Sequence, residues 1–505
     1  MDSAEFVKTP KQGPIDPPTD KCGIMTTASP AIHNAPLPAD GPGSKQFSNL
    51  ALVGFLILIP LFVTRKLGGG LKTWILFAVI FALPILMAYW TILSSYSPRL
   101  NEKVKYPNRP ISYYLEYHTP ELKAKYVDSN GGKGKKIPLE TFQELFFNGK
   151  VSFKGDCLDV MEYKHDWATF RFTLSLFKFF LFGMIPEVIL HSQSQDEEQV
   201  RDHYDRGDDF YTWFLGPRMI YTSGVIGDIE REETLEEMQD NKLTILADKI
   251  QLKKDEHVLD LGCGWGTWAA FASYKHGAKV TGVTLGKNQT KWGTDLFKKY
   301  GVSSEQSRIE CVDYRDSPPS KKPNGLYDKI TCLEMAEHVG VRRFGTFLQQ
   351  VYDTLEDDGL FFLQYAGLRK RWQYEDLVWG LFMNKYIFPG ADASTPLSFV
   401  VTALESTGFE VVSLDNIGVH YSGTLYRWYK NWLSNKEKVV NKYGIRWYRI
   451  WEFFLASSTI VSRQGSATCY QIVLRKNLNS YHRVNYIPAQ KGLLAPLETK
   501  QEWVK

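Results

Sequence analysis

The sequence has few cysteines, and none lies at a spacing that holds a metal ion. Six cysteines occur in 505 residues, without a C-x-x-C pair. This pattern predicts no metal site and indicates a reducing compartment. The chain also has little net charge, since its formal value at neutral pH is +4. So small a charge on so long a chain predicts neither nucleic acid nor a strongly acidic partner.

The beginning of the chain lacks an apolar run. No apolar segment lies near Met1, so we expect no cleaved signal peptide. Residues 1–48 are rich in Pro, Gly, Ala, Ser and Asp, a composition that buries too little apolar surface to order itself. We therefore expect a disordered tail at 1–48, and a second tail at 481–505.

Two runs without a charged residue follow the first tail. Residues 50–64 and 73–93 are dominated by apolar side chains, and glycines at 68–70 separate them. Each run approaches the roughly 17–25 residues that span a bilayer as a helix, and a helix satisfies its own backbone groups in lipid. The sequence predicts a two-helix transmembrane hairpin at 49–95. A pair of buried core helices is the alternative.

A third apolar stretch, residues 170–190, is too polar to span a bilayer. Arg171, Lys178 and Glu187 interrupt it, and Pro186 breaks its helical continuity. It suits a helix lying in the membrane interface, with its apolar side in the acyl boundary. A core helix of a soluble domain fits equally well. We expect residues 96–190 to form a linker region that contains this segment.

Beyond residue 190 the sequence alternates between strand and helix patterns. Apolar runs typical of buried strands recur at 258–261, 279–285, 307–312, 328–333 and 359–365. Helices are expected at 233–249 and 269–275. This alternation predicts an α/β fold with a Rossmann-like, doubly wound sheet. A ligand of such a sheet belongs at the carboxyl ends of its strands.

The first of these strands breaks into a glycine-rich turn. Asp260 ends the strand, and glycines follow at positions 262, 264 and 266. Glycine permits a tight turn and lets a ligand approach the backbone closely. The dinucleotide-binding pattern is absent, because Thr267 replaces its third glycine and the strand at 279–285 ends without a ribose-binding acid. The turn resembles that of S-adenosylmethionine (SAM)-dependent methyltransferases, whose acid faces the cofactor's amino group.

Other segments at the expected strand ends complete a nucleoside cradle. Tyr314 can stack on an adenine, and Asp313 can accept a hydrogen bond from its exocyclic amine. The cofactor-binding residues expected on this basis are Asp260, Leu261, Gly262, Cys263, Gly264, Trp265, Gly266, Thr284, Leu285, Gly286, Lys287, Asn288, Gln289, Asp313, Tyr314 and Arg315.

The order of the motifs resembles that of the cyclopropane-fatty-acid synthase family. Besides the glycine turn, the matching segments are residues 203–205, 219–224, 284–289, 313–316, 337–340, 386–390 and 420–425. The resemblance runs from about residue 200 to residue 476 and implies a class I SAM-dependent methyltransferase sheet with helical lid insertions, in a domain at 191–480. It adds Tyr221 and Thr222 to the expected cofactor site.

The chain is most similar to the fungal branch of that family. It has the two apolar runs, a long amino-terminal region, and Gln364-Tyr365-Ala366 in place of the usual His-Thr-Ile. This resemblance implies methyl transfer to C9 of the Δ8-unsaturated sphingoid base of ceramide or glucosylceramide, a membrane lipid. It implies a multi-pass protein of the endoplasmic reticulum, although no retention tetrapeptide ends the chain, with its catalytic domain in the cytosol beside the SAM pool.

Members of the family use a bicarbonate ion as base, and its ligands carry over residue by residue. The family's Glu maps to Glu337 and its Tyr to Tyr421, whereas Gln364 replaces a His, Ser223 a Cys and Leu333 an Ile. The Cys and Ile positions contribute mostly main chain, and Gln keeps an amide donor. The resemblance therefore implies the catalytic residues Glu337, Tyr421, Gln364 and Ser223, with bicarbonate as a second bound group.

The residue types suit the chemistry. An alkene is a weak nucleophile, and positioning it against the methyl group supplies roughly 7–11 kcal/mol. Methyl addition leaves a carbocation, which aromatic faces stabilise by about 0.5–2 kcal/mol each. Tyr421, Tyr365, Phe388 and residues 426–432 offer such faces. A base then removes a proton: loss from the new methyl group closes a cyclopropane, and loss from the methylated carbon restores the double bond.

Other functions remain open. Cyclopropane synthesis or methylation on unsaturated phospholipid acyl chains uses the same cradle. A nicotinamide-dependent membrane oxidoreductase is disfavoured by Thr267, and a non-catalytic lipid-binding protein by the intact Asp260, Gly264 and Glu337. His338 follows Glu337 at a helix start, and we expect it to point elsewhere.

Overall fold

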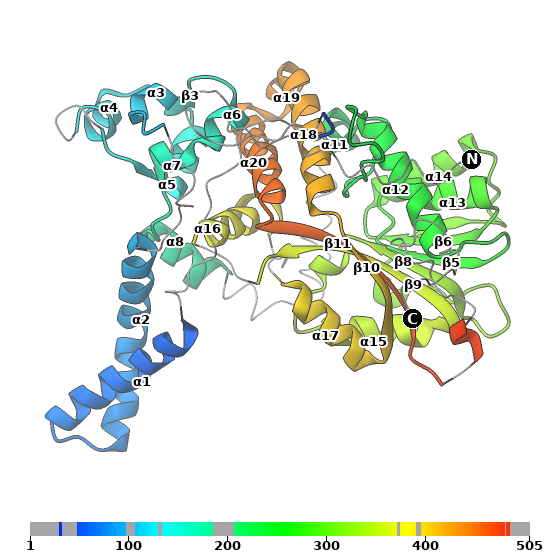
Figure 1. The fold of residues 1–505 in the computed structure, drawn as a ribbon, viewed down its shortest axis with the longest axis horizontal. Coiled ribbons are helices and arrows are strands. Elements are labelled where there is room, and N and C mark those ends of the chain that lie inside the picture. Colours follow the sequence, from blue (N-terminus) through cyan, green and yellow to red (C-terminus); the bar gives the residue numbers. More distant parts are fainter. Residues whose placement is uncertain are drawn as a thin grey trace, which may run out of the picture.

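The computed structural model describes residues 30–32, 48–96, 107–129, 134–184, 207–370, 374–389, 395–479 and 481–484. A helical hairpin projects from a larger body in which helices surround a sheet (Figure 1). Most of the tail expected at 1–48, nearly all of that at 481–505, the motif at 203–205 and Gly390 lie outside the described residues.

A seven-stranded sheet organises the carboxyl-terminal part of the body, in the order β10-β11-β9-β8-β5-β6-β7. The strands are β5 (His257–Leu261), β6 (Lys279–Thr284), β7 (Arg308–Cys311), β8 (Tyr327–Leu333), β9 (Leu355–Leu368), β10 (Phe409–Asn416) and β11 (Ala467–Lys476). Neighbours among β5 to β9 are parallel, whereas β11 is antiparallel to both β9 and β10. The predicted parallel strands are confirmed, and the antiparallel pair at the edge was not anticipated.

Helices flank this sheet on both sides (Figure 1). They are α12 (Leu235–Lys249), α13 (Thr267–His276), α14 (Lys287–Lys299), α15 (Phe344–Thr354) and α17 (Leu397–Thr407). The helix expected at 233–249 begins at Leu235 because Thr234 and Glu237 form a capping box there. Helix α13 ends at His276, and the left-handed conformation of Gly277 caps its last turn.

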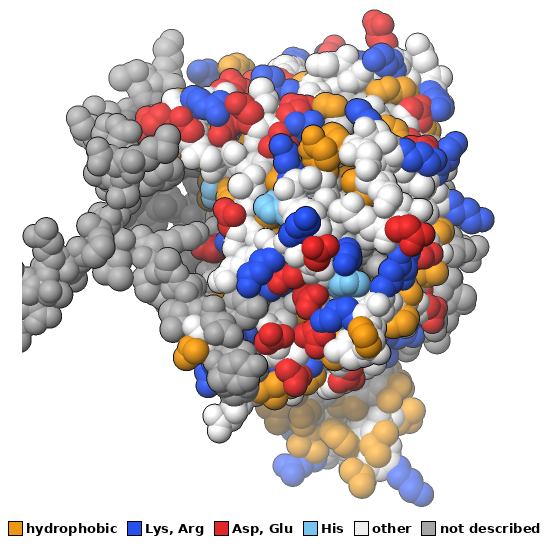
Figure 2. Space-filling model, turned by 90° about the vertical axis from the view of Figure 1, so that its right-hand side faces the viewer, with side chains coloured by type: hydrophobic (Ala, Val, Ile, Leu, Met, Phe, Trp, Pro, Cys, Tyr) orange, Lys and Arg blue, Asp and Glu red, His pale blue; other side chains and the backbone are white. Residues whose placement is uncertain are grey.

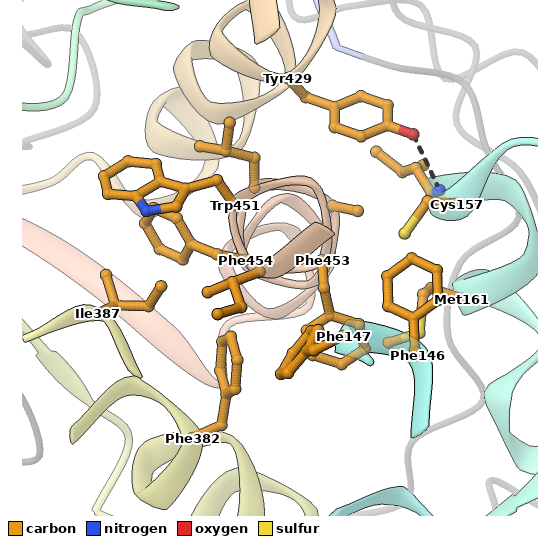
Figure 3. Packing of buried hydrophobic residues seen from close by; sticks show 14 of the residues in the cluster. Phe146, Phe147, Cys157, Met161, Phe382, Ile387, Tyr429, Trp451, Phe453 and Phe454 are labelled. Carbon is orange, nitrogen blue, oxygen red and sulfur yellow. Dashed lines mark hydrogen bonds between the residues drawn. The ribbon is translucent and has the colours of Figure 1, made fainter. Parts of the chain in front are cut away.

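A second group of helices covers one end of the sheet and surrounds an aromatic core. It contains α11 (Asp208–Leu215), α16 (Tyr374–Phe382), α18 (Gly418–Ser434), α19 (Lys436–Tyr443) and α20 (Ile445–Arg463). Figure 3 looks along α20, from which Trp451, Phe453 and Phe454 project to different sides. The Phe453 ring lies 5.1 Å from that of Phe382 and 5.9 Å from that of Phe147. Helix α20 is therefore the centre of this core.

The segment before the sheet is a folded unit, so the expectation of a linker at 96–190 is wrong. It contains α3 (Ile111–Tyr114), α4 (Pro120–Tyr126), α5 (Leu139–Phe147), α6 (Cys157–Glu162), α7 (Lys164–Trp167) and the paired strands β1 (Leu115–Tyr117) with β3 (Val151–Phe153) and β2 (Ile137–Pro138) with β4 (Ala168–Thr169). Phe142 and Trp167 are fully buried. A buried ion pair joins Glu162 to Arg463 of α20 at 2.6 Å. The unit packs against the helical core through long-range contacts, which its short elements do not reveal in the sequence.

The hairpin consists of α1 (Asn49–Lys66) and α2 (Leu71–Tyr96), and both helices are long and apolar enough to cross a membrane. Large apolar side chains face outward from it, among them Phe62, 64% exposed, and Val79, 71% exposed. Figure 2 shows it as an apolar projection with basic side chains near its tip. This exposure contradicts the alternative of buried core helices.

The third apolar stretch lies at the foot of the hairpin. It forms α8 (Leu174–Phe179) and a π-helical turn over Phe180–Met184, while residues 185–190 are outside the described part. Leu176 and Phe177 are buried, whereas Leu174 and Phe182 are exposed. The preceding Phe172 contacts α2, with its ring 5.2 Å from that of Trp90. The stretch thus presents one apolar face to the core and another outward.

Candidate active site

A cavity opens at the carboxyl ends of β5, β6 and β8, where open α/β sheets bind their ligands. Its empty volume is about 1220 Å³ including the open mouth. The expected cofactor residues that line it are Tyr221, Thr222, Asp260, Gly262, Cys263, Gly264, Trp265, Thr284, Leu285, Gln289, Asp313, Tyr314 and Arg315.

Five expected cofactor residues do not line this cavity: Leu261, Gly266, Gly286, Lys287 and Asn288. Leu261 is buried in the core beside the sheet. A side chain at Gly266 would meet the Cα of Gly293 at 3.1 Å, so this glycine lets α13 and α14 pack closely. Gly286 caps α14, Lys287 and Asn288 begin it, and the Lys287 side chain is exposed.

Asp260 presents a buried acceptor to the cavity. Its Oδ1 accepts a hydrogen bond from Thr331 Oγ1 at 2.8 Å, while its Oδ2 is buried without a partner among the described residues. Burial raises the pKa of this carboxyl to about 7, against the opposing effects of Thr331 and Lys242. A ligand that carries a cation or a donor would satisfy the open oxygen. The amino group expected to face Asp260 has this chemistry.

The glycine turn leaves its backbone open to a ligand at one position. Gly264 has a φ of +54°, and no atom lies within 4 Å of the place where a Cβ would stand. At Gly262, by contrast, a Cβ would lie 2.6 Å from the Cβ of Met335. Gly264 therefore faces the cavity, whereas Gly262 permits close packing beneath it.

The opposite wall holds the residues expected to bind adenine. Both oxygens of Asp313 accept hydrogen bonds from the Arg315 guanidinium, each at 2.6 Å. The Tyr314 ring packs edge-on against Phe347, with centroids 5.4 Å apart. Asp313 thus has a cationic partner already, and Arg315 holds its carboxylate in place.

We did not single out Glu334 from the sequence. It is the centre of a cluster of contacting side chains that we call the acidic side of the cavity. Its Oε1 accepts hydrogen bonds from Ser223 N at 2.9 Å and Gln364 Nε2 at 2.6 Å, with Cys469 Sγ at 3.5 Å. Burial, and then the charge of the neighbouring Glu334, raise the pKa of the Tyr421 hydroxyl well above its usual value. Glu334 lines the cavity, whereas Ser223, Gln364 and Tyr421 do not.

The backbone at Glu334 is strained. Its φ is +54°, a left-handed conformation that costs a residue with a Cβ roughly 1–2 kcal/mol. Such strain persists where surrounding contacts determine it, and it is frequent at functional sites. A signal was present in the sequence, because an acid lies between a strand end and the motif at 337–340. Its importance depends on contacts from segments far away in the chain.

Glu337 and His338 both differ from the expected arrangement. Glu337 Oε1 accepts a hydrogen bond from Ala366 N at 2.5 Å, but Glu337 does not line the cavity. Burial, and then the charge of Glu334, raise its pKa to about 8. His338 does line the cavity, contrary to our expectation, and burial lowers its pKa to about 4. The imidazole is therefore neutral at physiological pH.

Neighbouring strands fix the orientation of the Gln364 amide. Gln364 Oε1 accepts from Gln471 Nε2 at 3.0 Å, and Gln471 Oε1 accepts from Lys249 Nζ at 2.7 Å. Because its carbonyl oxygen is occupied in this way, the Gln364 NH₂ group points to Glu334. The register of β9 and β11 pairs Gln364 with Gln471 and so builds this relay.

Aromatic rings lie close to the acidic side. Tyr221 contacts Phe388 at 6.0 Å and Trp428 at 5.4 Å between centroids, and Trp428 contacts Tyr421 at 6.1 Å. Tyr365, which we expected among them, instead hydrogen-bonds Thr395 and packs against Phe344 on the other side of the sheet. Successive strand residues face opposite sides, so Tyr365 cannot share the face of Gln364.

The sheet order and the position of the cavity define a class I SAM-dependent methyltransferase fold. The structure matches the cyclopropane synthase MmaA2 from Mycobacterium tuberculosis with 25% identity and a TM-score of 0.50, over 55% of this chain and 98% of that one. It matches the mycolic acid cyclopropane synthase CmaA1, complexed with SAH and CTAB, with 25% identity and a TM-score of 0.51, over the same shares. The cofactor of this fold is SAM.

Sequence comparisons define the family. A model of the mycolic acid cyclopropane synthetase family matches residues 191–472. The sphingolipid C9-methyltransferase of Candida albicans is 72% identical over 100% of this chain and 98% of its own length. That of Komagataella phaffii is 71% identical over 96% of this chain and 98% of its own. The chain therefore belongs to the mycolic acid cyclopropane synthetase family, in the group of the sphingolipid C9-methyltransferases.

Proposed function

We propose that this chain transfers a methyl group from SAM to C9 of the Δ8-unsaturated sphingoid base of ceramide or glucosylceramide. One observation carries the proposal: a single cavity joins the glycine turn at Asp260 and Gly264 to the acidic side at Glu334. A methyl donor and a proton acceptor can thus meet the same alkene. The full-length similarity to sphingolipid C9-methyltransferases supports this substrate.

The residues present fit SAM. Asp260 offers its open oxygen to the amino group, Gly264 leaves room beside the turn, and Tyr314 lines the wall where the adenine would lie. When bound, the cofactor supplies an electrophilic methyl group. The chain's own residues then hold the alkene, exclude water and accept a proton.

The aromatic rings close to the acidic side suit a carbocation. When the alkene electron pair forms the new carbon–carbon bond at C9, the positive charge develops at C8. Tyr221, which lines the cavity, offers a face to this charge, and Phe388 packs against Tyr221. Neutral His338, whose ring lies 5.9 Å from that of Phe388, adds no repulsive charge. We propose that Glu337, Tyr421, Gln364 and Ser223 organise the group that then removes the C9 proton.

We further propose that the hairpin at 49–95 spans the membrane of the endoplasmic reticulum and that the domain at 191–480 lies in the cytosol, beside the SAM pool. The exposed apolar surface of α1 and α2 supports a membrane span. Leu174 and Phe182 are exposed near the exposed Arg171 and Lys178, a combination that suits the membrane interface. The alkene would reach the cavity from that surface.

Lipid analysis distinguishes this function from cyclopropane synthesis on phospholipids. The full-length protein is expressed in a host that makes Δ8-unsaturated sphingoid bases without a C9 branch, and cells are fed methionine with a CD₃ group. We expect a sphingoid base that gains one methyl group with all three deuteriums and keeps its double bond. A product on acyl chains, or one that retains two deuteriums in a ring, would contradict the proposal.

A further inference from the structure

We infer that the Glu334 carboxylate is the anion of this site and is itself the base that removes the C9 proton, so that no bicarbonate is required. The inference rests on the proposed function, because the proton in question is that of a methylated sphingoid base. It assigns the acid–base step to a residue of the chain.

The contacts of Glu334 support this assignment. The resemblance to the cyclopropane-fatty-acid synthase family implies that the residues at Ser223, Gln364 and Tyr421 hold a bicarbonate ion. In the structure, the Ser223 amide and the Gln364 amide group donate to the Glu334 carboxylate, and the charge of Glu334 helps to raise the pKa of the Tyr421 hydroxyl. A protein carboxylate thus occupies the donors that an external anion would use.

The charges around Glu334 disfavour a second anion. Glu337 is buried beside it, and burial together with the charge of Glu334 raises the pKa of Glu337 to about 8, so this region already disfavours a second negative charge beside Glu334. Burial also raises the pKa of Asp260, in the wall of the same cavity, to about 7. Lys242 also lines the cavity; burial lowers its pKa to about 8 against the opposing charge of Glu334, and its ammonium donates to Thr222 Oγ1 at 2.5 Å. The Cys469 thiol contributes a weak donor. The charge of Lys242 balances that of one carboxylate here and does not balance a second anion.

The backbone conformation gives an independent argument. Position 334 has a φ of +54°, which glycine adopts without strain. A glutamate at this position carries a backbone penalty, yet its side chain receives hydrogen bonds from three other segments of the chain. These contacts hold the Glu334 carboxylate at the wall of the cavity, where a proton acceptor for a bound ligand has to stand.

The step balances without an added reactant. The C8=C9 electron pair forms the bond to the methyl carbon, and the electrons of the broken carbon–sulfur bond remain on sulfur. Glu334 takes the C9 proton, and the C9–H electron pair becomes the new C8=C9 double bond. The carboxylic acid then returns its proton to solvent after the product leaves.

The first test asks whether the full-length enzyme in lipid nanodiscs needs bicarbonate. Turnover of a Δ8-unsaturated ceramide and of the corresponding glucosylceramide is measured in carbon dioxide-depleted buffer and again after addition of bicarbonate. We expect the two rates to agree within about twofold. A rate that falls more than tenfold on depletion would overturn the inference while leaving the proposed function intact, whereas absence of any C9-methylated product would overturn the proposed function itself.

The second test replaces the carboxylate. Glu334→Gly relieves the backbone strain and opens the anion position, whereas Glu334→Gln fills it with a neutral amide of the same shape. We expect turnover to fall by about 10²–10⁴ in both variants, the usual effect of losing a positioned base. Added bicarbonate or formate should restore at least tenfold to Glu334→Gly only. Normal turnover of Glu334→Gly in depleted buffer would exclude Glu334 as the base.

Two further readouts do not depend on turnover. Calorimetry should give both variants an affinity for S-adenosylhomocysteine within about threefold of wild type, which shows that the cofactor side is folded. Nuclear magnetic resonance of ¹³C-bicarbonate should detect saturable binding to Glu334→Gly and none to wild type. Saturable binding to wild type, abolished in Gln364→Ala, would show that bicarbonate uses these donors and would contradict the inference.

Discussion

The two sides of the cavity are built in different ways. The cofactor side comes largely from one short stretch of chain, in which Asp260 ends a strand and Gly264 exposes the backbone of the turn. The acidic side depends on side chains from distant segments, which meet at Glu334. A local motif therefore reveals the first side in the sequence, whereas the second exists only when β8, β9, β11 and α18 are assembled.

The largest effect should come from breaking the cofactor side alone. In Gly264→Val the new side chain enters the cavity, at a φ of +54° that a branched residue rarely adopts. We expect calorimetry to detect no binding of S-adenosylhomocysteine, and turnover to be lost with it.

Gly301→Val is the matched control for this variant. Gly301 also has a positive φ, +69°, and no atom within 4 Å of a new Cβ, but it does not line the cavity. It carries a similar backbone penalty and should bind the cofactor normally. If Gly264→Val bound the cofactor as wild type does, the glycine turn would not have the role in cofactor binding that we assign to it.

Breaking the acidic side should affect turnover and spare binding. We expect Glu337→Gln to lower turnover by about 10²–10⁴, because Glu337 accepts a hydrogen bond from the Ala366 backbone and is buried next to Glu334. The affinity for S-adenosylhomocysteine should change by less than about threefold. A parallel loss of affinity would mean that the two sides are one cooperative unit.

The same variant has a pH signature. Burial raises the pKa of Glu337 from 4.5 to about 8. Between these values the unfolded chain releases the proton and the folded chain keeps it, so wild type loses stability as the pH rises through this window. Glu337→Gln lacks this effect. Its melting temperature relative to wild type should increase from pH 5 to pH 8. A difference in melting temperature that does not change with pH would show that Glu337 lies in a more polar environment.

The difference between local motifs and contacts from distant segments also explains which features could be predicted from the sequence. Strands β5 to β9 and the hairpin were predictable because each has a continuous apolar pattern. The unit formed by residues 107–184 was not, because its elements are short and Phe142 and Trp167 are buried only in tertiary contact. Glu334 was missed for a related reason: its partners Ser223 and Gln364 lie 111 and 30 residues away.

A smaller effect is expected from changing one donor on the acidic side. Gln364→His removes the acceptor for Gln471 Nε2 and shifts the donor to Glu334. We expect turnover about tenfold lower, the cost of one weakened hydrogen bond of about 1.5 kcal/mol, and a minor share of cyclopropane or of an alkene isomer. Mass spectrometry with CD₃-labelled SAM distinguishes them. Full activity with an unchanged product would remove Gln364 from the mechanism.

The smallest effect on the cofactor side should come from deleting residues 1–95. The hairpin contacts the body near Phe172, whose amide donates to Ser94 Oγ at 3.1 Å, and none of its residues lines the cavity. We therefore expect the affinity for S-adenosylhomocysteine to stay within about twofold, while turnover of bilayer lipid falls.

Exposed Leu174 and Phe182 should retain weak attachment of the truncated protein to vesicles in a sedimentation assay. Adding Leu174→Ser and Phe182→Ser should abolish that attachment and leave cofactor binding unchanged. A truncated protein that is folded by circular dichroism but binds no cofactor would show that the hairpin helps to shape the cavity.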